Sequence, residues 1–271
     1  MIIAIKDFSL ERTLSSGQIF SFFKKDEYWY SFTDKPIAIR QSQDRIELLG
    51  LSESEAKSLL GLNDKISEIK AEIDKDDFID RAIAYSGSLR VVKSGLWPAT
   101  LSFILSIQSN VNLILRRIQN MSEFYGISGE INGISLKSFP PFDEIYEKGY
   151  ETLKKFKLGF RTKFVFSAAS YFHSHELDES MGKEDLSRHL LDIDGVGEKV
   201  LDCIKLYGLH DLTSFPMDVW IFRILSLYYN HITGKYKSYK DKRKAIVDYF
   251  GQYAGYAELS IYDYSRLNSI K

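Results

Sequence analysis

Lys199 and Asp218 are the two residues whose types and spacing are best suited to chemistry. Lys199 follows the glycine-rich turn DGVG (residues 194–197), and Asp218 lies nineteen residues further on, within the segment PMDV. A neutral lysine amine attacks electron-poor carbon to form a covalent intermediate, and a nearby carboxylate stabilises positive charge that develops there. Taken alone, Lys199 is an exposed lysine at a helix start, and Asp218 is the N-cap of a helix over 219–230. The pair, in this context, predicts a catalytic site.

The turn before Lys199 predicts an anion-binding backbone. Gly195 and Gly197 let the chain approach a ligand closely, and the helix that follows points free N–H groups outward. Such a turn suits a DNA phosphate. A dinucleotide-binding fingerprint is excluded because Val200 stands at the third glycine position and a helix, not a strand, precedes the turn.

Composition describes an ordinary globular chain. Of its 271 residues, 44% are hydrophobic and 27% are charged. The single cysteine, Cys203, excludes an internal disulfide framework and any metal site built from four cysteines. We find neither a signal-peptide pattern nor an apolar run long enough for a membrane span, so we expect a cytoplasmic protein with no membrane partner.

Charge distribution says more about partners than the net charge of −1. Residues 154–163 carry five basic side chains and no acid, and residues 235–244 carry six basic side chains and one acid. Either run alone is equally well a solvated helix face. The aromatic residues among these cations favour a surface that follows a nucleic-acid backbone; they are Phe156, Phe160, Tyr236 and Tyr239.

The elements that must position these residues form an α+β chain. The first fifty residues predict short strands in the segments MIIAIK, QIFSFF, EYWYSF, PIAIR and RIELLG. After Ser52, an expected N-cap, the pattern is helical throughout. Helices are predicted at about 76–86, 97–123, 149–156, 162–176, 183–190, 197–208, 217–230, 239–250 and 255–267. We therefore expect an antiparallel β domain with flanking helices over residues 1–80, followed by a mostly helical body over 81–271.

Within that body, residues 184–208 resemble the helix–hairpin–helix DNA glycosylases. The resemblance rests on a hairpin, the pattern G-V-G-x-K, and an aspartate nineteen residues after the lysine. It implies that Asp218 stabilises the oxocarbenium ion formed as an N-glycosidic bond breaks. It also implies that Lys199 attacks C1′ to give a Schiff base, and that the enzyme has strand-cleaving lyase activity. Because a lysine amine has a pKa of about 10.4, we expect the site to favour its neutral form by burial or neighbouring positive potential.

Two further segments resemble the eukaryotic-type 8-oxoguanine glycosylases, of which this chain is identified as a prokaryotic member. They are LERTLSSGQIFSF in the β domain and GQYAGYAELSIY near the C-terminus. The first implies that the Gly17 carbonyl accepts the N7–H that 8-oxoguanine has and guanine lacks. The second places Tyr262 where an aromatic ring stacks on the extruded base, with Cys203 on its other side. Glu258 stands where the family usually has a glutamine reading the Watson–Crick edge. Taken alone, Gly17-Gln18 is a turn between strands and Tyr262 is ordinary helix core.

The resemblance also implies residues that contact duplex DNA once a base is flipped. Gln108 matches the position that fills the gap, Phe160 the wedge, and Arg161 a reader of the orphaned cytosine. Two departures stand out: Leu113 replaces a second arginine, and Trp220 replaces a histidine two residues after the aspartate.

No cofactor is expected to be required. The resemblance implies that backbone carbonyls of Leu191, Ile193 and Val196 hold a monovalent or alkaline-earth cation beside DNA. His173 and His175 suggest a metal site only weakly, since no third ligand is spaced with them.

We therefore expect a bifunctional glycosylase/lyase that acts as a monomer on 8-oxoguanine in double-stranded DNA, associated with the nucleoid. Two alternatives stay open at this point. One is a glycosylase for alkylated purines on the same scaffold, which usually lacks the lysine. The other is a non-catalytic helix–hairpin–helix DNA-binding protein, which needs neither Lys199 nor Asp218.

Overall fold

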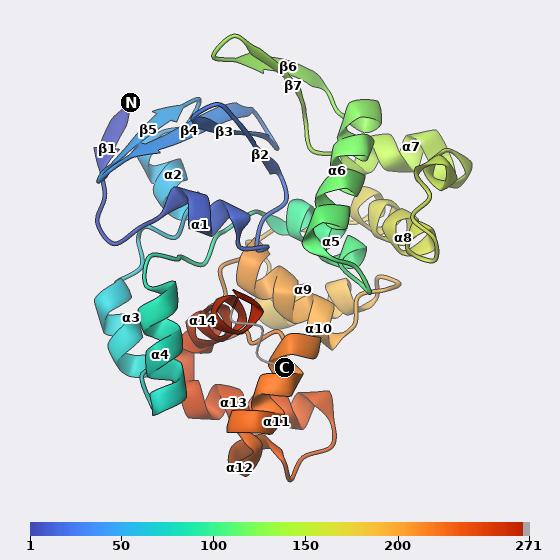
Figure 1. Ribbon diagram of the computed structural model, residues 1–271. Coiled ribbons are helices and arrows are strands. Elements are labelled where there is room, and N and C mark those ends of the chain that lie inside the picture. The colour runs from blue at the N-terminus through green and yellow to red at the C-terminus, as the bar shows by residue number, and fades with distance from the viewer. Residues whose placement is uncertain (268–271) are drawn as a thin grey trace.

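The N-terminal part of the chain is a five-stranded antiparallel sheet with strand order β1-β5-β4-β3-β2 (Figure 1). The computed structural model describes residues 1–267. The strands are β1 (Ile2–Ala4), β2 (Phe22–Lys25), β3 (Tyr28–Phe32), β4 (Pro36–Ser42) and β5 (Arg45–Leu49). Ile39 pairs with Leu48 across β4 and β5, and both side chains are buried. The predicted N-terminal antiparallel sheet is confirmed, and its central strands β3 and β4 each bury three consecutive residues.

The segment between β1 and β2 differs from its prediction. A short helix, α1 (Leu10–Ser15), is capped by the Ser9 hydroxyl, which accepts a hydrogen bond from the Arg12 N–H. Strand β2 begins only at Phe22, so the first four residues of QIFSFF are not in a strand. Gly17 turns the chain with a φ of +94°, and the Gln18 amide bonds the Arg90 carbonyl and the Val92 N–H. These bonds fix the Gly17 turn against a distant segment of the chain.

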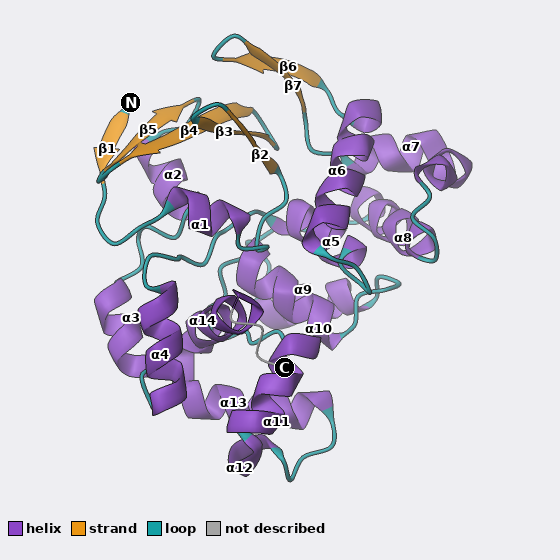
Figure 2. Ribbon diagram, in the orientation of Figure 1, coloured by secondary structure: helices purple, strands orange, loops and turns teal. Residues whose placement is uncertain are grey.

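The rest of the chain is mostly helical, as expected (Figure 2). Its helices are α2 (Glu53–Leu59), α3 (Ile66–Ile73), α4 (Asp77–Ser86), α5 (Leu96–Leu105), α6 (Val111–Tyr125), α7 (Phe142–Leu153), α8 (Arg161–Ser174), α9 (Lys183–Leu191), α10 (Glu198–Cys203), α11 (Val219–Tyr228), α12 (Asn230–Thr233), α13 (Tyr239–Phe250) and α14 (Ala254–Leu267). Three short helical turns join them: 3₁₀ turns at Lys154–Phe156 and Gly251–Tyr253, and a π-helical turn at Ile204–Gly208 that continues α10.

Three predictions for this part were wrong in detail. The single helix expected at 97–123 is two helices, α5 and α6, separated by an irregular loop in which Gln108 has a φ of +48°. Asn110 then starts α6 by accepting a hydrogen bond from the Leu113 N–H at 3.0 Å. The connection after α6 contains a hairpin of β6 (Ser128–Ile131) and β7 (Ile134–Lys137), and α3 was not predicted. The break between α5 and α6 matters most, because it creates the loop that borders the candidate site.

The helices at the end of the predicted first domain lie with the C-terminal helices. Both α3 and α4 pack against α14, below the sheet in Figure 1. The predicted division at residue 80 falls inside α4 and stays a prediction. No helix within residues 1–267 is long and apolar enough to cross a membrane.

Candidate active site

The hairpin between α9 and α10 has the tight geometry that its glycines predict. Gly195 has a φ of +90°, and a Cβ built there would lie 2.5 Å from the Phe164 ring. Ile193 and Val196 point into the core, and the Val196 N–H donates to the Ile193 carbonyl at 3.0 Å. Gly197, in contrast, has open space where a side chain would be. The hairpin is therefore packed from behind by Phe164 and leaves the backbone at Gly197 accessible from in front.

One cavity of about 930 Å³ brings together residues from five separate parts of the sequence. Lys199 and Asp218 line it together, so the predicted catalytic pair is gathered in space. Its lining also includes the predicted residues Gly17, Gln108, Gly195, Gly197, Cys203, Glu258 and Tyr262. A cavity of this volume accommodates a ligand the size of a purine nucleoside.

Lys199 lies in the wall of this cavity with its amine directed at α5. Its Nζ donates to the Ser106 hydroxyl at 3.5 Å and lies 5.7 Å from the centre of the Phe103 ring. Burial lowers the pKa of Lys199, but Cys203, Asp218 and Glu258 raise it by a larger amount, so the pKa is raised overall. Burial therefore acts in the expected direction, but the expectation that burial or a neighbouring positive potential makes the neutral amine favoured is wrong for the chain without DNA.

Asp218 is the N-cap of α11, as the sequence predicted. Its Oδ1 accepts a hydrogen bond from the Ile221 N–H at 2.8 Å. Burial raises the pKa of Asp218, opposed by this backbone bond and by Lys199. The cap holds the carboxyl group at the cavity wall while the helix N-terminus favours its negative charge.

Glu258 is the most deeply buried acid in the cavity wall, with 4% of its surface exposed. Its Oε2 accepts a hydrogen bond from the Tyr207 hydroxyl at 2.6 Å. Burial raises the pKa of Glu258 to about 8, and the tyrosine hydrogen bond opposes this shift. At neutral pH the carboxyl group is therefore mostly protonated. It then offers a donor and an acceptor, and a glutamine amide likewise has both.

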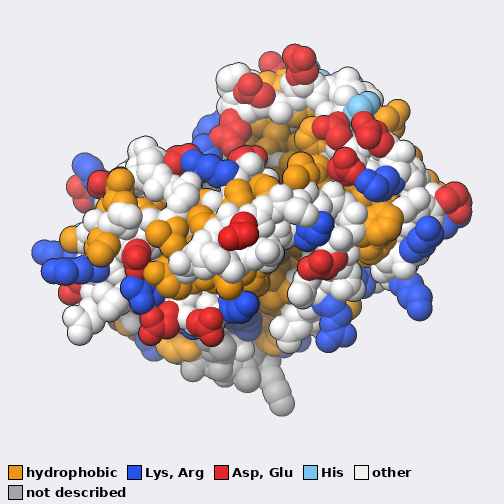
Figure 3. Space-filling model, turned by 90° about the horizontal axis from the view of Figure 1, so that it is seen from above, with side chains coloured by type: hydrophobic (Ala, Val, Ile, Leu, Met, Phe, Trp, Pro, Cys, Tyr) orange, Lys and Arg blue, Asp and Glu red, His pale blue; other side chains and the backbone are white. Residues whose placement is uncertain are grey.

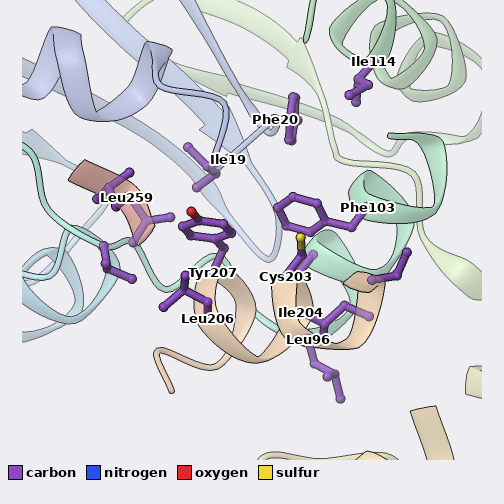
Figure 4. Close-up of a cluster of buried hydrophobic side chains, with 14 of the residues drawn as sticks. Ile19, Phe20, Leu96, Phe103, Ile114, Cys203, Ile204, Leu206, Tyr207 and Leu259 are labelled. Atoms are coloured by element: carbon purple, nitrogen blue, oxygen red, sulfur yellow. The ribbon is translucent and has the colours of Figure 1, made fainter. Parts of the chain in front are cut away.

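The apolar part of the wall surrounds Cys203. Figure 4 shows the Cys203 sulfur next to the Phe103 ring, with Tyr207 beside them. The Phe103 and Tyr207 rings stack with their centres 5.7 Å apart. Burial raises the pKa of the Cys203 thiol to about 12, so the thiol is neutral. Gly17 and Tyr262 also lie close together in the lining, because a Cβ at Gly17 would be 4.0 Å from the Tyr262 hydroxyl. Cys203 and Tyr262 both line the cavity, and an apolar wall of this kind suits a flat aromatic ring.

Of the residues expected to contact DNA outside the base pocket, Gln108 lines the cavity, Phe160 is exposed and Arg161 is turned inward. Arg161 is only 6% exposed, and its Nη2 donates to the carbonyls of Ile107 and Gln108, the second at 2.7 Å. The Arg117 Nη1 donates to the Ser109 hydroxyl at 3.0 Å in the same loop. Phe160 is exposed, and the Arg161 guanidinium lies over its ring. Without DNA, both arginines thus hold the loop that carries Gln108.

The two basic runs are less uniformly exposed than the sequence suggested. Phe156 packs against Tyr125, and Tyr239 bonds the buried Asp202, so neither ring is offered to a ligand. Phe160 remains as the exposed aromatic of the two runs, with Tyr236 half-buried. The face of the molecule in Figure 3 also mixes acidic and basic side chains. A continuous aromatic and basic track is therefore not formed as expected.

Side chains do not supply a metal site in the part of the chain described. Within residues 1–267 no three His, Cys, Asp or Glu side chains are grouped to hold a metal ion. His173 bonds Asp143 instead, and His175 stacks on Tyr171. The backbone carbonyls of the hairpin could still hold an ion. A carbonyl oxygen has two lone pairs, and the Ile193 carbonyl accepts one N–H, from Val196. The hairpin backbone is thus compatible with a cation held by carbonyl oxygens.

Sequence reasoning missed Tyr207, Ser106 and Phe103 as parts of the cavity. Each belongs to a helix that reads as plain core, and each reaches the cavity only through the way α5 packs against the π-helical turn after α10. A buried tyrosine needs a partner for its hydroxyl, so a tyrosine four residues after Cys203 was the one available signal.

Similarity to known proteins agrees with this arrangement. No family model matches the chain. The N-glycosylase/DNA lyase of Saccharomyces cerevisiae is 28% identical over 206 residues, which span 63% of this chain and 55% of the yeast protein. The probable N-glycosylase/DNA lyase of Methanothermobacter thermautotrophicus is 25% identical over all of this chain and 97% of its own length.

Solved structures show the same fold over nearly the full length. The structure of MBOgg1 in complex with a low-affinity DNA ligand has a TM-score of 0.89, with 26% identity over 99% of this chain and 96% of that one. The 3-methyladenine DNA glycosylase of Archaeoglobus fulgidus has a TM-score of 0.77 at 19% identity over the whole of both chains, which concerns the fold alone.

Fold, hairpin and cavity together define a DNA glycosylase of the helix–hairpin–helix class. Within that class, the chain is similar to 8-oxoguanine glycosylases of known structure and to proteins named N-glycosylase/DNA lyase.

Proposed function

We propose that this chain is a bifunctional DNA glycosylase/lyase that flips 8-oxoguanine out of double-stranded DNA, excises it and then cleaves the strand. The single observation that carries the proposal is that Lys199 and Asp218 line the same cavity. A protein that only binds DNA has no need for this pair of side chains. An alkylated-purine glycosylase on the same scaffold is the weaker alternative, because Lys199 and the Gly17 turn have no use there. A non-catalytic DNA-binding protein is weaker still, because it needs neither member of the pair.

The reaction starts with charge stabilisation at C1′ of the damaged nucleotide. As the bond from C1′ to the base breaks, the Asp218 carboxylate stabilises the oxocarbenium ion. The neutral Lys199 amine forms a bond to C1′, and opening of the sugar ring gives a Schiff base. The proton that Lys199 gives up balances the one that the departing base takes up. Loss of a proton from C2′ and of the phosphate at C3′ then breaks the strand by β-elimination.

The timing of the lysine proton follows from the electrostatics of the empty cavity. The pKa of Lys199 is raised there, because the electrostatic effect of Asp218 and its neighbours outweighs that of burial. A bound base displaces water from the cavity, and this desolvation favours the neutral amine. We therefore propose that Lys199 becomes a nucleophile only once the base is bound. Undamaged DNA is then not exposed to a reactive neutral amine.

Base recognition is proposed to rest on four residues of the cavity wall. The Gly17 carbonyl accepts the N7–H of 8-oxoguanine, and a guanine lone pair at that place is repelled. Tyr262 and Cys203 enclose the base from its two faces, and Glu258 reads the Watson–Crick edge. Each contact is an expectation from the resemblance that the shared cavity supports.

DNA contacts outside the cavity are proposed for the loop and hairpin. Gln108 fills the gap left by the base, Phe160 wedges the stack, and Arg161 approaches the orphaned base. The backbone N–H groups at Gly195 and Gly197 bind a phosphate. Carbonyls of Leu191, Ile193 and Val196 hold a monovalent or alkaline-earth cation at this contact. We also keep a monomeric state and a cytoplasmic, nucleoid-associated location as proposals.

The decisive experiment is covalent trapping. Wild-type protein is incubated with a duplex containing 8-oxoguanine and with borohydride, which reduces a Schiff base to a stable adduct. We expect an adduct with wild type and none with Lys199→Gln, whose affinity for the lesion duplex should be nearly unchanged. Lys65→Gln, which changes an exposed lysine outside the cavity lining, is the control and should trap normally. Substantial adduct in Lys199→Gln means that another amine attacks, and no adduct in wild type overturns the proposed function.

A further inference from the structure

A buried polar cluster joins the two elements that carry Lys199 and Asp218. Its centre is Asp202, which lies on α10 three residues after Lys199 and has 1% of its surface exposed. A buried carboxylate is costly unless it is paired and hydrogen-bonded. Both of its partners come from α13, the helix that carries the second basic run of the sequence.

The Tyr239 hydroxyl is the bridge in this cluster. It donates to Asp202 Oδ2 at 2.8 Å and accepts the Met217 N–H at 3.0 Å. Met217 is the residue immediately before Asp218. One hydroxyl group therefore connects the helix of the nucleophile to the turn of its acidic partner.

Charge completes the arrangement. The Arg243 Nη1 donates to Asp202 Oδ1 at 2.6 Å, so both carboxylate oxygens are occupied. Burial raises the pKa of Asp202 to about 6, while Arg243, Tyr239 and Lys205 act in the opposite direction. The ring of Tyr239 packs edge-on against Phe222 of α11, with ring centres 6.0 Å apart, which limits its movement.

We propose that Tyr239 and Asp202 are positioning residues for the reaction, holding Lys199 and Asp218 at the separation that attack on C1′ requires. Neither touches the substrate. This inference rests on the proposed function. The geometry of reacting groups is worth a great deal, because a displacement of about 1 Å can cost roughly a hundredfold in rate. The basic neighbours of Tyr239 led us to expect a contact with DNA. Its hydroxyl instead bonds Asp202 and Met217, on the protein side of the site.

The test removes one hydroxyl group. In Tyr239→Phe the ring stays, Met217 loses its acceptor and Asp202 loses a donor. We expect the single-turnover rate of base excision to fall by roughly ten- to a hundredfold, with affinity for the lesion duplex changed less than about threefold. Tyr236→Phe is the matched control, because it removes a hydroxyl from a half-buried tyrosine three residues earlier, under Lys235. Its rate should equal that of wild type.

A pH profile separates positioning from a general loss of structure. Removing the Tyr239 donor raises the pKa of Asp202 further, since that hydrogen bond lowers it. The charged groups that face Asp202 are Arg243 and Lys205, and it also acts electrostatically on Cys203 and Glu258. The acidic limb of the excision rate should therefore move to higher pH in Tyr239→Phe, which a lower melting temperature alone does not cause.

Three outcomes decide the matter. An excision rate and pH profile equal to those of wild type overturn the inference. An equal loss in Tyr236→Phe overturns it too. If Tyr239→Phe does not fold, Asp202→Asn serves instead, and a normal rate in that variant overturns the inference. Failure of wild type itself to trap on lesion DNA is a failure of the proposed function, and is thereby distinguished from these results.

Discussion

The Tyr207 hydroxyl donates to Glu258 Oε2 at 2.6 Å, inside a cavity wall where both residues are almost fully buried. The phenol fixes one carboxyl oxygen, so the other is the one available to a ligand. Because burial raises the pKa of Glu258 to about 8, this acid is mostly neutral at pH 7. The glutamic acid at this position thus differs less from the glutamine of the family than its formal charge suggests.

The first prediction concerns stability and pH. The pKa of Glu258 in the folded chain, about 8, is above its ordinary value of 4.5. The neutral acid therefore contributes stability that is fully present below the unfolded pKa and is lost as pH rises through the folded pKa. In Glu258→Gln this loss should be absent, and chemical denaturation should show a smaller decrease of the free energy of unfolding up to pH 8. Glu184→Gln, at an exposed position, is the control and should show the same dependence of unfolding free energy on pH as wild type. The same dependence in Glu258→Gln would contradict the assignment.

The second prediction concerns recognition of the base by the same residue. Glu258→Gln should bind the lesion duplex as wild type does, since the amide restores a donor and an acceptor. Glu258→Ala should bind about ten times more weakly, because donors on the buried base lose their partner. Affinity is measured by titration in the Lys199→Gln background, where no chemistry follows. Equal binding by Glu258→Ala would remove this residue from the recognition scheme.

The third prediction isolates the charge of Asp218 from its structural role. Asparagine is as good an N-cap as aspartate, so Asp218→Asn should leave the start of α11 intact. Base release should nevertheless slow by about a hundred- to a thousandfold, with little change in affinity. Asp76→Asn, at the N-cap of α4, is the matched control and should have a normal rate. Full activity of Asp218→Asn in single-turnover excision contradicts the assignment.

The fourth prediction changes the substrate instead of the protein. An 8-oxo-7-deazaguanine base has no N7–H to donate to the Gly17 carbonyl. It should bind more weakly than 8-oxoguanine by about five- to a hundredfold, the range for an acceptor left without its partner. The comparison uses duplexes that differ only in this base. Equal affinity for the two would show that the Gly17 carbonyl does not recognise the lesion.

The fifth prediction is relaxed discrimination of the opposite base. Strict reading of an orphaned cytosine calls for donors to both O2 and N3, and a charged hydrogen bond is worth about 1.5–3 kcal/mol. Leu113 offers no donor and Arg117 is occupied with Ser109, so Arg161 is left as the single arginine matched to this role, and without DNA it bonds the Gln108 carbonyl. Single-turnover excision opposite C, T, G and A should therefore proceed at comparable rates.

A cytosine preference above about a thousandfold contradicts that reading. In that case an arginine must leave its present partners when DNA binds. Arg116→Ala and Arg117→Ala then identify which one, since the two follow Leu113 by three and four residues on the same helix face. Arg116 is exposed and free to move at little cost.

Local patterns were enough to predict most of the fold. Short segments rich in β-branched and aromatic residues predicted the strands of the sheet, and Ser52 is the N-cap of α2 as expected. The break at residues 106–110 was missed because SIQSN lacks proline and glycine, and propensity alone favours one continuous helix. What ends α5 is tertiary: the Arg161 guanidinium occupies the Ile107 and Gln108 carbonyls, 54 and 53 residues away in sequence.

The site was predictable where chemistry fixes residue type and spacing, and not where it depends on packing. Lys199 and Asp218 were found from their motif, and the cavity contains both. Tyr207 was missed because a tyrosine within a helix usually contributes to the core. Tyr239 was misread, because its basic neighbours face solvent while its own side chain turns to Asp202. A sequence pattern gives the residues of a helix, but only the packing decides which of them face inward.

The loop held by Arg161 and Arg117 bears on the thermodynamics of binding. Gln108 adopts a left-handed backbone conformation, which is uncommon outside glycine, asparagine and aspartate. Immobilising a flexible loop costs conformational entropy when a partner arrives. Here the loop loses its conformational entropy during folding, because hydrogen bonds within the chain already order it. The protein thus approaches DNA with its gap-filling residue preorganised, and the entropy lost on association falls mainly on the side chain of Gln108 and on the DNA.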